Sequence, residues 1–90
     1  MPKDEKFGLA SQIKRSAVSI PSNIAEGCSR KTNKEVARYL EIAIGSAFEL
    51  ETQILIAEKR KMLDKANTAF ILDELRQIQK MIYALSLIHI

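Results

Sequence analysis

The stretch that decides the fold of this chain is residues 19–27, which read SIPSNIAEG. A proline and several polar side chains lie here inside a segment that has the apolar spacing of a helix. The apolar positions recur every three or four residues, and they are Phe7, Ala10, Ile13, Ala17, Ile20 and Ile24. This spacing predicts one apolar helix face that runs across Pro21. Because proline removes a backbone hydrogen bond, we expect a helix over about residues 4–26 that continues through Pro21 with a kink.

The helix boundaries follow from residues that favour helix ends. Gly27 is typical of the left-handed position just after a helix, so it predicts the end of the first one. Thr32 and Glu35 have the spacing of a capping box and predict the start of a second helix, which ends near Met62. Asp64 predicts the start of a third helix that continues to the C-terminus.

Two apolar seams predict how these helices pack. The seam of the second helix is Val36, Leu40, Ala43, Ala47, Leu50, Ile54 and Ala57. The seam of the third helix is Ile71, Leu75, Ile78, Ile82 and Leu85, broadened by Phe70, Leu72 and Met81. Such seams are typical of helical bundles. The sequence therefore predicts an all-α, up-and-down helical bundle.

The second helix has more apolar surface than one seam requires. The additional residues are Tyr39, Ile42, Ile44, Phe48, Leu55 and Ile56. A helix that is apolar over most of its circumference is buried on more than one side. We therefore expect Ile44, Phe48 and Leu55 to form a face that a neighbouring subunit covers.

Composition limits the class of protein. Ninety residues with 47% hydrophobic content and one cysteine indicate a single small domain of the reducing cytoplasm. The sequence has no apolar run near 18 residues, so it predicts no membrane span.

Positive charge is concentrated near the first turn. Residues 1–38 hold eight Lys or Arg against four Asp or Glu, whereas residues 39–57 hold three Glu and no base. The candidate nucleic-acid contacts are Lys14, Arg15, Arg30, Lys31, Lys34 and Arg38. Such a set can bind phosphate, but it can equally be ordinary solvated surface.

A second group of polar residues predicts contacts between helices. Ser46 and Glu49 share one helix face beside Gly45, whose small size would let another helix approach. The carboxylate of Glu49 could then meet Ser22 or Asn23 of the first helix. We interpret the group as a structural network or subunit contact rather than a catalytic centre. Its members are Ser22, Asn23, Glu26, Gly45, Ser46 and Glu49.

Catalytic chemistry has few candidate groups in this sequence. The only histidine is His89, far along the chain from Cys28, and Cys28 itself is more typical of an inert residue near a helix end. The sequence has no Glu-x-x-His pair for a di-iron site and no glycine-rich phosphate loop. We therefore expect no catalytic residue, no metal and no cofactor.

Two longer motifs carry a family resemblance. Residues 8–27 read GLASQIKRSAVSIPSNIAEG and residues 45–51 read GSAFELE. In order and spacing these resemble the two signatures of the 23S rRNA intervening-sequence proteins, also called the four helix bundle protein family. The resemblance covers Lys3 to about Ala84. It implies small helical subunits that assemble into rings, usually pentamers. It also implies a relation to accessory proteins of diversity-generating retroelements, which bind RNA and a reverse transcriptase.

The resemblance leads to an expectation about both ends of the chain. The family has a helix before Lys3, so we expect residues 1–84 to be a bundle domain with about three of four helices. Residues 85–90, LSLIHI, resemble a translated transposon-adaptor end. The alternative is a last native apolar turn, since Leu85 keeps the heptad spacing.

Two functions follow from these observations. The first is a non-catalytic, ring-forming accessory protein that binds RNA. The second is an oligomeric scaffold that presents helix faces to a protein partner without binding nucleic acid.

Overall fold

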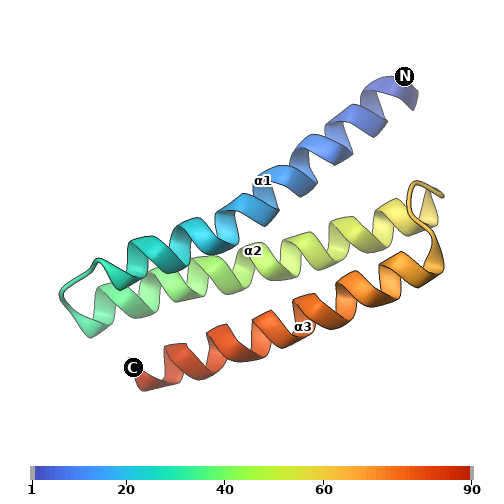
Figure 1. The fold of residues 1–90 in the computed structure, drawn as a ribbon. Coiled ribbons are helices and arrows are strands. Elements are labelled where there is room, and N and C mark those ends of the chain that lie inside the picture. Colours follow the sequence, from blue (N-terminus) through green and yellow to red (C-terminus); the bar gives the residue numbers. More distant parts are fainter. Residues whose placement is uncertain (1, 90) are drawn as a thin grey trace.

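The computed structural model describes residues 2–89, with side chains from Gly8 onward, as three helices joined by two short turns (Figure 1). α1 spans Pro2–Cys28, α2 spans Asn33–Lys59 and α3 spans Lys65–Ile88. Every element of this part of the chain is helical, as the sequence predicted. α2 lies between the other two helices, and successive helices run in opposite directions. α1 and α3 each pack on α2, and the backbones of α1 and α3 do not come close to each other in the described part of the chain.

The prediction that α1 continues through the proline is confirmed. Pro21 lies inside α1, which is one helix over its whole length. The amide Nδ2 of Asn23 donates to the Ser19 carbonyl at 2.8 Å, which adds a hydrogen bond in the turn that contains the proline. The first turns of α1 lean away from α2 (Figure 1). The side chain of Phe7, the first position of the predicted apolar face, lies outside the described residues.

The prediction for Gly27 is wrong, and the structure gives a different reason for this glycine. α1 includes Gly27 and ends at Cys28, and no described glycine has a positive φ. A Cβ atom added to Gly27 would lie 3.1 Å from Cβ of Tyr39 on α2. Gly27 therefore lets the two helix backbones approach each other, and its conformational freedom is not used.

The left-handed residue of the described chain is Lys61, with φ of 61°. It follows α2, which ends at Lys59 rather than near Met62. The backbone N–H of Lys61 donates to the Glu58 carbonyl, and that of Met62 donates to the Ala57 carbonyl, both at 2.9 Å. These two bonds form a Schellman motif, in which glycine usually holds the left-handed position.

Both predicted helix starts are confirmed. The Thr32 hydroxyl accepts a hydrogen bond from the Glu35 N–H at 3.2 Å, and Asp64 Oδ1 accepts one from the Asn67 N–H at 2.7 Å. These side chains satisfy N–H groups that have no partner inside the helix. The sequence therefore predicted correctly where α2 and α3 begin.

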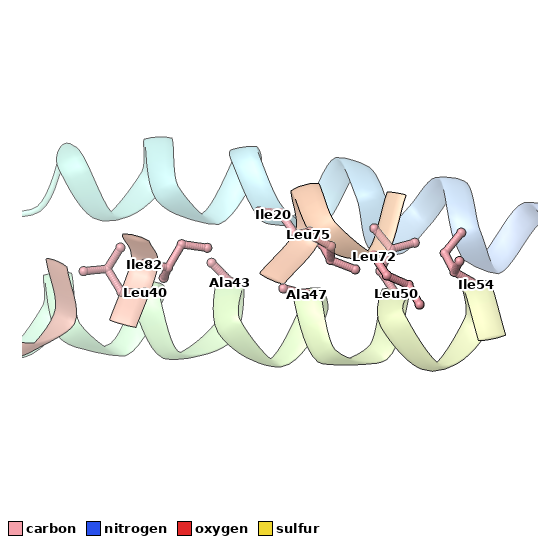
Figure 2. Packing of buried hydrophobic residues seen from close by; sticks show 9 residues of the cluster. All are labelled: Ile20, Leu40, Ala43, Ala47, Leu50, Ile54, Leu72, Leu75 and Ile82. Atoms are coloured by element: carbon pink, nitrogen blue, oxygen red, sulfur yellow. The ribbon is translucent and has the colours of Figure 1, made fainter. Parts of the chain in front are cut away.

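The core lies along one side of α2 (Figure 2). Six of the seven predicted seam positions of α2 are buried, and the seventh, Val36, packs against the core. Ala43 and Ala47 are fully buried, and their small side chains let neighbouring helices lie close to α2. From the other two helices, the core receives Ile20, Leu72, Leu75 and Ile82.

The predicted seam of α3 is only partly buried. Leu75 and Ile82 are buried and Ile71 packs against the core, but Ile78 and Leu85 are exposed. Two residues expected to broaden this face, Phe70 and Met81, are also exposed, whereas Leu72 is buried. The reason is that the backbone of α3 lies close to that of α2 alone in the described part of the chain, so a single side of its apolar face is covered.

Candidate functional site

The turn between α1 and α2 is organised around Arg30. Its Nη2 donates to Glu26 Oε2 at 2.6 Å and to Tyr39 Oη at 3.1 Å, and its Cζ lies 4.8 Å from the centroid of the Tyr39 ring. Glu35 Oε2 is 3.8 Å from Nη1. An arginine whose planar group is held by two carboxylates and an aromatic ring fixes the geometry of a turn. Arg30 is therefore committed to contacts inside the chain.

Three other predicted cations at this end differ from Arg30. Lys31, Lys34 and Arg38 are exposed, and none forms an ion pair with any side chain in the described part of the chain. Lys34 and Arg38 lie one helical turn apart on α2 and line a hollow of about 550 Å³ together with Glu41 and His89. We call Lys31, Lys34 and Arg38 the cation triad.

The remaining two predicted cations lie elsewhere. Lys14 and Arg15 are exposed on α1, and Arg15 lies 13 residues before Cys28, which is about 20 Å along a helix. Arg15 lines a cleft of about 790 Å³ between α1 and α2. The structure thus separates the six predicted nucleic-acid contacts into a cation triad, a turn-fixing Arg30 and two residues on α1.

A row of polar contacts joins α1 to α2 along one side of the core. The Ser16 hydroxyl donates to Glu49 Oε1 at 2.7 Å, and the hydroxyls of Ser19 and Ser46 are 2.7 Å apart. Asn23 Nδ2 donates to the Ser19 hydroxyl at 2.9 Å. These bonds form two separate groups, one that joins Ser16 to Glu49 and one that joins Ser19 to Ser46 and Asn23.

Other details of the predicted network are wrong. The partner of Glu49 is Ser16 and not Ser22 or Asn23, because the helices are antiparallel and Glu49 faces a point nearer the start of α1. Ser22 is exposed, and Glu26 belongs to the Arg30 turn. Sequence reasoning also missed Ser16 and Ser19, although their spacing with Asn23 by three and four residues marks one helix face.

Gly45 makes no close approach to another helix of this chain. An added Cβ atom would find no atom within 4 Å, and the backbone there is ordinary helix. The expectation that Gly45 lets α1 approach α2 is therefore wrong. Of the predicted subunit face, Phe48 and Leu55 are exposed, with 54% of Phe48 accessible, and Ile44 is partly buried.

An apolar groove lies between α1 and α3. Its volume is about 580 Å³, and its lining is apolar throughout. We call it the α1–α3 groove and define it by Ile20, Pro21, Ile24, Ile78, Met81 and Leu85. The exposed residues of the predicted α3 seam are thus one wall of this groove.

Comparison with known families gives the identity of the chain. The family model described as 23S rRNA-intervening sequence protein matches residues 1–84. The chain belongs to this family. A comparison with curated proteins finds no match.

In this member of the 23S rRNA-intervening sequence protein family, the two motifs that carry the resemblance lie on the packed α1–α2 pair. Residues 8–27 form most of α1 and supply Ser16, Ser19 and Asn23, and residues 45–51 of α2 supply Ser46 and Glu49. The motifs that carry the resemblance therefore meet in the polar network.

Neither a cluster of metal-ligating side chains nor a membrane-spanning helix occurs in the described part of this family member. Among the side chains of residues 8–89, the structure places no group of three or more His, Cys, Asp or Glu that could hold a metal ion, and Cys28 is exposed. None of the helices described is both long enough and apolar enough to cross a membrane.

Proposed function

We propose that this protein is a non-catalytic accessory protein that assembles with copies of itself and binds RNA through the cation triad. The observation that carries the proposal is the contrast between Arg30, which is held by Glu26 and Tyr39, and the exposed triad beside it. Cations without an intramolecular partner lose little when they meet a phosphate, and each such contact releases counterions. Assembly repeats the triad once per copy, which multiplies a modest local charge.

The test is binding of a fluorescently labelled RNA oligonucleotide by the full chain over a series of salt concentrations. We compare the unmodified protein with the variant Lys31→Gln, Lys34→Gln, Arg38→Gln. The expected result is weaker binding and a plot of log affinity against log salt that is shallower by about 2, since three phosphate contacts are lost. Surface substitutions of this kind usually change stability by less than about 0.5 kcal/mol.

The matched control removes the same charge elsewhere. Lys59→Gln, Lys65→Gln, Lys80→Gln changes three exposed lysines outside the α1–α2 turn. RNA binding by this control should keep the salt slope of the unmodified protein. Equal losses in both triple variants, or no RNA binding at low salt, would show that the triad is ordinary solvated surface.

A second function, an oligomeric scaffold for protein partners, is favoured by the α1–α3 groove. An open apolar groove with exposed Met81 and Leu85 in its lining is typical of an interaction site. Apolar docking has a negative heat-capacity change and little salt dependence, whereas phosphate binding weakens steeply with salt. Calorimetry that measures the heat-capacity change of partner binding and its dependence on salt therefore separates the two functions.

A further inference from the structure

We propose that the cleft between α1 and α2 binds a small zwitterion, namely a free amino acid with one ammonium and one carboxylate group. We call it the α1–α2 cleft and define it by Arg15, Ser16 and Ser19 on α1 and by Ser46, Glu49 and Gln53 on α2. Its volume of about 790 Å³ lies in the range of small-molecule sites. This inference is independent of self-assembly and of the RNA binding proposed for the cation triad.

The lining of the cleft contains a buried acceptor without a partner. Gln53 is 7% exposed, and its Oε1 atom is buried and accepts no hydrogen bond in the described part of the chain. Its Nε2 atom reaches Glu49 Oε1 only at 3.5 Å, which is long for a hydrogen bond. Buried polar atoms without a partner are destabilising and rare in native proteins. A donor that enters the cleft would supply the missing bond.

The acceptors of the cleft lie together on α2. Glu49 and Gln53 are four residues apart and so share one helix face. Glu49 Oε1 accepts from Ser16, whereas Glu49 Oε2 forms no hydrogen bond or ion pair with the side chains that the structure describes. A free carboxylate oxygen beside an amide oxygen favours a cationic donor. An ammonium group fits, since it carries three N–H donors and a positive charge.

The donors of the cleft lie next to these acceptors. Arg15 and Ser19 are four residues apart on α1, and Arg15 forms no ion pair within the described part of the chain. Ser19 accepts from Asn23, and its hydroxyl is 2.7 Å from that of Ser46. The two hydroxyls share one of their hydrogen atoms, so the other O–H can donate to a ligand. A guanidinium and a hydroxyl together favour a carboxylate.

Spacing and charge balance point to one small molecule that carries both charges. Ser46 meets Ser19 and Glu49 meets Ser16, and Ser46 and Glu49 are about 4.5 Å apart along α2. The ammonium and carboxylate of an amino acid are bonded to one carbon atom, so they can contact both places at once. Glu49 would repel a phosphate and Arg15 would repel a polyamine. A zwitterion meets neither repulsion.

The rest of the lining indicates the side chain of the amino acid. Gln12 carries an amide, Thr52 carries a hydroxyl, and Ile56 adds an exposed apolar side chain. A ligand amide could form two hydrogen bonds with the amide of Gln12, because each amide has both donors and an acceptor. L-Glutamine is therefore the probe that matches the lining.

The decisive experiment is an NMR titration of the isotope-labelled full chain with L-glutamine. We expect saturable binding with a dissociation constant on the order of 1 mM for a ligand of this size. Two analogues each lack one charge, since N-acetyl-L-glutamine has no ammonium and L-glutaminamide has no carboxylate. Each should bind about tenfold more weakly, because a charged hydrogen-bonded contact is lost. No saturable response to L-glutamine, or equal affinities for it and both analogues, would overturn the proposal.

Arg15→Gln tests the end of the cleft that meets the carboxylate. The variant should bind L-glutamine about tenfold more weakly but should bind L-glutaminamide as the unmodified chain does, because that analogue has no carboxylate. Lys14→Gln is the matched control, since Lys14 is an adjacent exposed cation outside the lining of the cleft. Its affinity for L-glutamine should not change, and equal losses in the two variants would contradict the site. RNA binding by Arg15→Gln should equal that of the unmodified chain, so a failure of this site is distinguishable from a failure of the cation triad.

Gln53→Met tests the buried acceptor without changing any charge. Methionine has a similar length and no unpaired oxygen, so the variant without ligand should unfold at a temperature about 4 °C higher. Its affinity for L-glutamine should fall about tenfold. A purely structural role for Gln53 would give the opposite pattern, with a lower unfolding temperature and unchanged affinity. That pattern would remove Gln53 from the site and overturn the proposal.

Discussion

Ser16 on α1 and Glu49 on α2 are joined by a 2.7 Å hydrogen bond, 33 positions apart in the sequence. Ser16 is buried, whereas Glu49 reaches solvent at the cleft between the two helices. Ser19 and Ser46 repeat the same pairing one turn further along α1. This relationship shows that the register of α1 against α2 is fixed by side-chain hydrogen bonds as well as by apolar packing.

Replacing Ser16 with alanine should therefore destabilise the chain by about 1–2 kcal/mol, since a hydrogen bond to a charged group is lost. Urea unfolding at one fixed protein concentration measures this, because the proposed assembly would make stability depend on concentration. Ser22→Ala is the control, on an exposed serine of the same helix, and should change stability by less than about 0.5 kcal/mol. Equal effects of the two substitutions would argue against a role for the Ser16–Glu49 bond.

Gly27→Ala should destabilise the chain by about 1 kcal/mol, although alanine is the better helix former. The added Cβ would lie 3.1 Å from Cβ of Tyr39, and the cost of overpacking exceeds the gain in helix propensity. Thermal unfolding followed by circular dichroism measures the shift. Gly8→Ala has open space around it and should be neutral or stabilising. A stabilised Gly27→Ala variant would mean that the α1–α2 approach tolerates a methyl group.

Lys61→Gly should stabilise the chain by about 1 kcal/mol, because a left-handed conformation is unfavourable for residues with a Cβ atom. The neighbouring Lys59→Gly is a matched comparison. Lys59 lies in the last turn of α2, where glycine should instead destabilise the helix. Urea midpoints of the two variants should therefore move in opposite directions, and a shift in the same direction would contradict the assignment of the Schellman motif.

Arg30→Gln should affect stability more than RNA binding. The substitution removes the ion pair with Glu26 and the contact with the Tyr39 ring, and we expect a loss of about 1 kcal/mol. Lys31→Gln alone should leave stability unchanged and lower RNA affinity. Unfolding experiments on both variants measure stability, and RNA titrations on both variants measure RNA affinity. A normal stability with sharply reduced RNA binding in Arg30→Gln would place Arg30 in the phosphate contact after all.

Local features of the sequence were sufficient to predict the elements of this fold. Thr32 and Asp64 cap helices because their side chains bond to N–H groups three residues away, and such contacts depend only on nearby sequence. The buried seam of α2 follows from helical periodicity in the same way. Pro21 could be placed inside α1 because the apolar spacing continues on both sides of it.

The site depended on relations between distant residues, which the sequence does not display. The pairing of Ser16 with Glu49 requires the register of two antiparallel helices, and the open space beside Gly45 requires the position of α1. Gly27 illustrates the limit most directly. Its residue type indicated a special position, but only the approach of Tyr39 showed that the position is a close contact and not a left-handed turn.

The sequence by itself determined that this chain forms three helices, where α2 and α3 begin, and which side of α2 is buried. The tertiary structure decided which charges are free and which apolar residues stay exposed. Arg30 and Lys31 are adjacent cations, yet only Arg30 meets Glu26 and Tyr39. The physical reason is that helix formation and capping act within a few residues, whereas burial and ion pairing depend on surfaces that the packing of α1 and α3 on α2 brings together.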